Sequence, residues 1–129
     1  MLMDSILTSI KKLIGIEEDY TQFDTDLIIH INTVFAILAQ LGVGPENGFT
    51  ITNKSATWAQ FIGNSADNLE AVKTYVYLKV FLLFDHTLSG PATEAIKQSI
   101  NELEWRLNVA ADHTGDHLLS REGREYVSG

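Results

Sequence analysis

The chain has 129 residues, a length typical of one domain that buries roughly two thirds of its unfolded surface. Its apolar fraction of 45% is that of an ordinary globular protein, and the lack of cysteine excludes disulfides and thiol chemistry. Nine Lys and Arg residues stand against 17 Asp and Glu residues, so the formal net charge of −8 argues against tight binding to nucleic-acid phosphates.

Two helices are predicted in the first third of the chain. Asp4 or Ser5 can cap the first helix, and Gly15 is well placed to end it. The second helix is predicted over residues 24–41 and stops at Gly42. Apolar residues recur at helical spacing in both segments, so each is expected to pack one face against a core. The acidic loop between them is interpreted as a solvated connection.

A long loop, residues 43–54, follows the second helix. Its first half is rich in glycine, proline and asparagine, as turns require. Phe49 and Ile51 lie in a stretch with the composition of a short strand or one arm of a β-hairpin. Loops of this length in small domains often carry function, so both residues are candidates for a partner contact. A short helix capped by Ser55 and ended by Gly63 is predicted next.

The most apolar stretch of the chain runs from Leu69 to Phe84. Steps of three and four give it one stripe that is predicted to face the core: Leu69, Val72, Val76, Val80 and Leu83. Tyr75, Leu78 and Leu82 lie on a second side. A helix that is apolar on nearly every side is central to a fold or is covered by a partner, so these three are candidate interface residues. Alternation also allows a strand, but the length without a turn signal favours the helix.

The last helix is predicted from Ala92 to about Ala111. Its core-facing seam repeats like a heptad and consists of Ile96, Ile100, Leu103, Leu107 and Ala110. Trp105 points almost directly away from this seam, with Val109 beside it. A single core cannot easily cover both sides of the helix, and tryptophan is enriched where proteins meet, so this pair is the main candidate interface. The alternative is a partly exposed tryptophan that lies against a neighbouring loop.

The chain is therefore divided into a helical domain, residues 1–111, and a C-terminal tail, residues 112–129, which is polar and predicted to be mobile. The tail contains four residues of types that bind transition metals: Asp112, His113, Asp116 and His117. Gly115 separates the two histidines and the chain end is near, so a solvated tail is the preferred interpretation. Since no phosphate loop, nucleophile–base pair or paired carboxylates are recognised, neither an enzyme nor a cofactor is predicted.

These elements together predict an all-α fold, a small bundle of four to five helices with one long loop that has room for a short β-hairpin. The segment LEAVKTYVYLKVFLLFD, followed by a turn and INELEWRLNVAA, resembles the head–tail connector (adaptor) proteins of long-tailed bacteriophages and prophages. DSILTSIKKLIGI and DTDLIIHINTVFAILAQLGVGP resemble their first two helices, so the likeness covers residues 4–111. His86 and Thr87 stand where a proline pair is expected, and the tail has no recognised counterpart.

The resemblance implies a structural virion protein that assembles into a dodecameric ring beneath the portal. Such a ring extends the DNA channel, lets DNA pass without specific binding, and presents a surface to the stopper or tail-completion protein. The expected location is the head–tail junction, with the host cytoplasm during assembly and no membrane. Two alternatives remain open: a small non-catalytic adaptor or regulatory protein that binds one cellular partner through Trp105 or the loop at 43–54, and a metal-dependent enzyme that uses the tail histidines.

Overall fold

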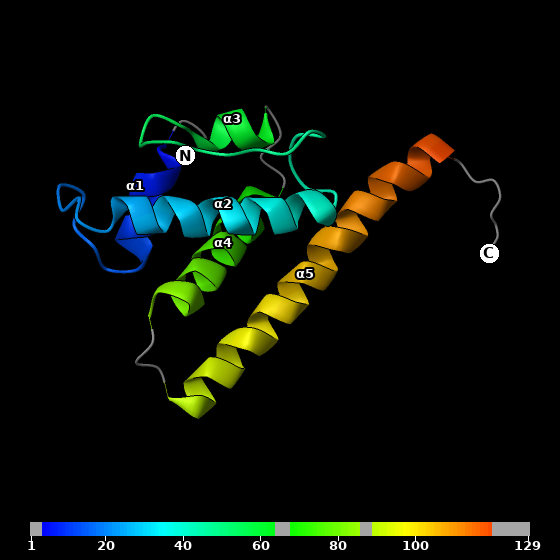
Figure 1. The fold of residues 1–129 in the computed structure, drawn as a ribbon. Coiled ribbons are helices and arrows are strands. Elements are labelled where there is room, and N and C mark those ends of the chain that lie inside the picture. The colour runs from blue at the N-terminus through cyan, green and yellow to red at the C-terminus, as the bar shows by residue number, and fades with distance from the viewer. Residues whose placement is uncertain (1–3, 64–67, 86–88, 120–129) are drawn as a thin grey trace.

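The fold is a bundle of helices, seen in a computed structural model that describes residues 4–63, 68–85 and 89–119 (Figure 1). For residues 112–119 only the helical backbone is described. The described chain forms five helices: α1 (Ile6–Leu13), α2 (Asp24–Gln40), α3 (Trp58–Ile62), α4 (Leu69–Phe84) and α5 (Gly90–Leu119). The only strand-like pairing in these ranges is an isolated bridge between Ser5 and Thr57. The predicted all-α class is confirmed.

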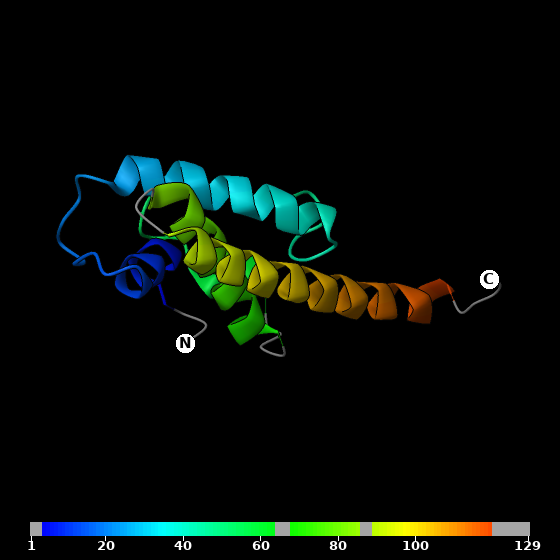
Figure 2. The same cartoon turned by 90° about the horizontal axis from the view of Figure 1, so that it is seen from below.

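Helix α4 is the centre of the bundle, as its apolar sequence predicts. It contacts α1, α2 and α5, and the short α3 lies near the start of α1 (Figure 1). The view turned by 90° shows α5 running along the bundle and extending past the end of α2 (Figure 2). The C-terminal part of α5 therefore projects from the body of the domain.

The core stripe of α4 is confirmed except at its last member. Leu69, Val72, Val76 and Val80 are buried, and Tyr75 is buried with them. Leu83, predicted to face the core, has 40% of its surface exposed. The reason is that the last turn of α4 reaches the edge of the bundle. There Phe84 packs edge to face against Phe23 instead, with ring centroids 5.2 Å apart.

The loop after α2 contains no strand at residues 49–52, so the suggested strand or β-hairpin is wrong. The side chain of Asn32 on α2 takes the place of a neighbouring strand. The backbone N–H of Ile51 donates to Asn32 Oδ1 at 2.7 Å, and Asn32 Nδ2 donates to the carbonyl oxygen of Ile51 at 3.0 Å. Because one amide side chain satisfies both backbone groups, the loop is held against α2 without a partner strand.

Two helix starts illustrate local capping. Ser5 caps α1 as predicted, because its Oγ accepts from the backbone N–H of Thr8 at 3.1 Å. The cap of α3 is Thr57, not Ser55. Thr57 and Gln60 form a capping box, in which each side chain accepts a hydrogen bond from the other residue's backbone N–H. The capping box provides acceptors for the backbone N–H groups of Thr57 and Gln60, which a cap at Ser55 would leave without these partners.

Helix α5 ends at Leu119, beyond the predicted end near Ala111. Gly115 does not interrupt it, since glycine inside a helix costs only about 1 kcal/mol relative to alanine. The predicted boundary between domain and tail therefore falls inside a continuous helix. The side chains of the four candidate metal ligands at 112–117, and residues 120–129, lie outside what the structure describes, so the metal hypothesis and the mobility of the tail stay untested.

Candidate interaction surfaces

The side of α5 that carries Trp105 and Val109, called the outer face below, points away from the core as the helical pattern predicts. Trp105 is 67% exposed and Val109 is 39% exposed, whereas Leu107 on the opposite side of the helix is 2% exposed. Next to Trp105, Arg106 Nη2 donates to Glu102 Oε2 at 2.6 Å. The outer face is therefore an exposed apolar surface, and the opposite charges of Glu102 and Arg106 beside it cancel each other.

The other predicted contact residues lie differently. Tyr75 and Ile51 are buried in the domain's own core, so neither offers a surface to another chain, and their proposed interface role is corrected. Tyr75 is buried because the neighbouring helices cover a wider face of α4 than the predicted apolar stripe. Ile51 is buried beside Asn32, and the two hydrogen bonds between them cannot be predicted from local sequence. Leu78, Leu82 and Phe49 are partly buried against the core and keep some exposed surface.

A polar link between α4 and α5 orients the outer face. The Tyr75 hydroxyl donates to Glu104 Oε2 at 2.7 Å, and Lys79 Nζ lies 3.9 Å from the same oxygen. Burial raises the pKa of the Tyr75 hydroxyl, and the hydrogen bond and charge of Glu104 raise it further. Tyr75 thus stays protonated and donating. Because Glu104 directly precedes Trp105, this link fixes the rotation of α5 that turns Trp105 outward.

A pocket of about 480 Å³, called the glycine pocket below, lies where the end of α2, α3, the start of α4 and α5 meet. Its described lining residues include no charged side chain: Gly42, Val43, Gly44, Pro45, Gln60, Phe61, Ile62, Gly63, Asn68, Val72, Leu107, Ala110 and Ala111. At Gly44 the backbone φ of +93° favours glycine, and a Cβ there would lie 2.5 Å from the Phe61 ring. Any side chain at this position would displace the pocket wall.

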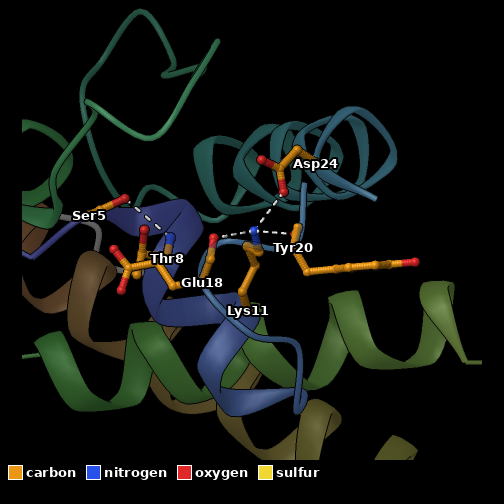
Figure 3. A network of polar contacts seen from close by, with 6 residues as sticks. All are labelled: Ser5, Thr8, Lys11, Glu18, Tyr20 and Asp24. Carbon is orange, nitrogen blue, oxygen red and sulfur yellow. Dashed lines mark hydrogen bonds and ion pairs between the residues drawn. The ribbon is translucent and has the colours of Figure 1, made fainter. Parts of the chain in front are cut away.

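Lys11 is the functional-looking residue that sequence reasoning missed. Its side chain is 2% exposed, and its ammonium group donates to the carbonyl oxygens of Glu18 at 2.9 Å and Tyr20 at 2.7 Å (Figure 3). It also forms an ion pair with Asp24 Oδ1 at 2.9 Å. The ammonium is thus held inside the chain by two hydrogen bonds and one ion pair. The backbone of the acidic loop is therefore fastened to α1, while the side chains of Glu17, Glu18 and Asp19 are exposed, as a solvated connection predicts.

A weak signal for this network was present in the sequence. Lys11 lies four residues after Leu7, on the apolar side of α1, where a lysine must find oxygen partners or leave the core. The partners themselves come from the loop and from α2, so their identity depends on the tertiary structure. Because Lys11 is buried and bound to groups of its own chain, its role is structural.

Over the described side chains, no group of three or more His, Cys, Asp or Glu residues could hold a metal ion. None of the described helices combines the length and the apolar character that crossing a membrane requires. The outer face of α5 and the glycine pocket, both formed with residues of α5, are the candidate interaction surfaces.

Comparison with known proteins gives one match. A family model described as phage connector protein matches residues 6–114, which extend from the start of α1 into the C-terminal part of α5. Neither the search of curated proteins nor the search of solved structures gave a match. The matched range contains the outer face, the glycine pocket and the polar link between α4 and α5.

Proposed function

This chain belongs to the phage connector protein family, and from that premise we propose that it forms a ring beneath the portal and joins the phage head to the tail. A phage connector is a structural protein of the head–tail junction. The finer proposal is that copies of the chain assemble into a dodecamer whose channel continues the path of the DNA. The single observation that carries it is the outer face of α5, where Trp105 is 67% exposed.

The exposed tryptophan supports assembly because, among the described residues, none gives it a hydrogen bond or a ring contact. Trp is enriched among the residues that dominate protein interfaces, and removing such an anchor typically costs about 2 kcal/mol or more per contact. In a closed ring the same contact recurs at every joint. Even a modest loss of binding free energy per contact would therefore be multiplied by the number of contacts in the ring. The outer face is proposed to contact either the next subunit or the portal.

The charge of the chain supports a passive channel. A formal net charge of −8 repels phosphates, and a conduit for DNA should let the duplex slide without holding it. The proposed role is non-catalytic and needs no cofactor. The other proposed partners are the portal protein and the stopper or tail-completion protein, and the subunit would be made in the host cytoplasm before it enters the virion.

Deletion of the coding sequence from the phage or prophage tests this function. We expect filled heads and separate tails in electron micrographs of the deletion strain, and joined particles when the wild-type chain is supplied from a plasmid. Images of the isolated junction should then show twelve copies of the chain around a channel. Joined particles in the deletion strain, or a junction that lacks the chain, would overturn the proposal.

A further inference from the structure

We propose that the outer face of one subunit docks on a second copy of this chain, with Trp105 inserted into the glycine pocket of that copy. The inference rests on the proposed ring and adds which two surfaces form its joint. Both surfaces belong to the described part of the chain and are accessible there, since Trp105 is 67% exposed and the glycine pocket has a volume of about 480 Å³.

The two surfaces point in opposite directions from one helix. Leu107, Ala110 and Ala111 line the glycine pocket from the α5 side, whereas Trp105 belongs to the outer face. Two residues along a helix correspond to a rotation of about 200°, so Trp105 faces almost directly away from Leu107. The polar link from Tyr75 to Glu104 holds α5 in this rotation. Each subunit therefore carries a projection on one side and a receiving pocket on the other.

This placement favours a head-to-tail joint over a symmetric dimer. In a symmetric dimer each copy inserts its Trp105 into the other, so the outer face and the glycine pocket of one copy must both face the same partner. They lie on opposite sides of α5, so one partner cannot cover both. When the outer face of one copy docks on the glycine pocket of another, the pair still has one free outer face and one free pocket. Further copies can therefore add in the same way, and the assembly ends when the rotation between neighbours closes it into a ring. The positions of Trp105 and the pocket are thus the arrangement that ring assembly requires.

Size and charge also match. Pockets that receive organic groups measure about 300–1,000 Å³, and the glycine pocket, at about 480 Å³, falls in this range, so an indole side chain can enter it. Its described lining is uncharged, and beside Trp105 the charges of Glu102 and Arg106 neutralise each other. Because each chain has a net charge of −8, two copies repel each other in most relative orientations. The repulsion is weakest where the two facing surfaces are locally neutral, as the outer face and the glycine pocket are.

The test uses paired cysteines, since the natural chain has none. Asn68→Cys places a thiol on the exposed rim of the glycine pocket, and Val109→Cys places one on the outer face while Trp105 stays intact. The double variant is supplied to the deletion strain, and joined particles are treated with a bifunctional thiol reagent longer than one helical turn. We expect a ladder of linked subunits on a denaturing gel, and single subunits from each single variant.

Asp26→Cys with Val109→Cys is the matched control, because Asp26 is exposed at the opposite end of α2 from the pocket. It should give no ladder. Dimers from Val109→Cys alone would indicate a symmetric contact and overturn the proposal. An equal ladder from the control pair, or no ladder in joined particles of the double variant, would overturn it as well. In the last case the particles are joined, so the connector function stands and only the assignment of the joint fails.

A second variant covers the case in which the double cysteine chain does not join particles. Val43→Asp puts a carboxylate into the glycine pocket at a partly buried position that packs against the core, so its melting temperature should fall, and joining is scored at a temperature where circular dichroism shows the chain to be folded. We expect particle joining to be lost as completely as with Trp105→Ala. Normal joining by a folded Val43→Asp chain would show that the pocket is not the receiving surface.

Discussion

The two tryptophans of this chain have opposite surroundings. Trp58, at the start of α3, is fully buried and its Nε1 donates to Ser9 Oγ at 3.2 Å. The ring of Phe35 meets it edge-on with centroids 6.4 Å apart, and Lys73 Nζ lies 5.7 Å from the ring centre. Trp105 is 67% exposed, and no residue in the described part of the chain gives it a hydrogen bond or a ring contact.

The difference teaches where to look for function in a protein without an active site. A tryptophan whose apolar body and N–H are both satisfied inside the domain is explained by stability. Trp105 keeps two thirds of its surface in water, although α5 is already packed along its other side. The packing of the described residues does not explain why a tryptophan stands at this position. A partner that covers it would gain the burial free energy that the subunit forgoes.

The largest effect that we predict from the comparison of the two tryptophans is on the free energy of unfolding. Trp58→Ala should lower the free energy of unfolding by about 3–5 kcal/mol, because it empties a fully buried site. Trp105→Ala is the matched control and should change it by less than about 0.5 kcal/mol, as exposed substitutions do. Urea unfolding followed by circular dichroism measures both. Similar losses in the two variants would mean that Trp105 is part of the core.

Lys11→Met sharpens the comparison for charged residues. The variant keeps the volume of the buried side chain but leaves the carbonyl oxygens of Glu18 and Tyr20 and the Asp24 carboxylate without their donor. We expect a loss of about 1–3 kcal/mol in unfolding free energy. Lys12→Met, at the exposed neighbouring position, should change little. Equal effects from the two substitutions would show that the buried network contributes nothing.

Tyr75→Phe should have a smaller effect, about 1 kcal/mol, since Glu104 is partly exposed and water can replace the lost hydroxyl. The effect should also depend on pH. The pKa of Tyr75 is raised in the folded chain, so above about pH 10 the unfolded chain loses a proton that the folded chain keeps. Stability of the wild type should therefore fall as pH rises past about 10.

The matched measurement for this pH effect is urea unfolding of both proteins at about pH 8 and about pH 11. The phenylalanine variant lacks the titrating group, so its loss of stability between the two pH values should be smaller. Tyr20→Phe, an exposed change, serves as the control and should follow the wild type. Parallel losses in the wild type and the Tyr75 variant would contradict the role of this hydroxyl.

The parts of the fold that follow from local pattern were predictable. The bounds of α4, the cap at Ser5 and the outward direction of Trp105 each depend on spacing within one helix, which the sequence contains. The parts that depend on distant partners were not. Lys11 finds its oxygen atoms in the following loop and on α2, and Ile51 is tied by a side chain nineteen residues earlier.

The candidate site divides in the same way. Trp105 and Val109 could be identified from one helix, whereas the glycine pocket forms only where four elements come together. Tyr75 was assigned to the surface because helical spacing alone cannot tell how wide a face the neighbouring helices cover. The far end of α5 was missed because Gly115 has the composition of a helix stop, while the helix itself continues through it.

The most direct test of the central claim is particle joining by Trp105→Ala. The variant chain, supplied to a strain that lacks its own copy, should be folded, with the helical circular dichroism and melting temperature of the wild type. We expect it to leave heads and tails unjoined in electron micrographs and to give few infectious particles, while Lys12→Ala joins them normally. Normal joining by the folded Trp105→Ala chain would contradict the account, because the outer face would then not be a contact of the connector.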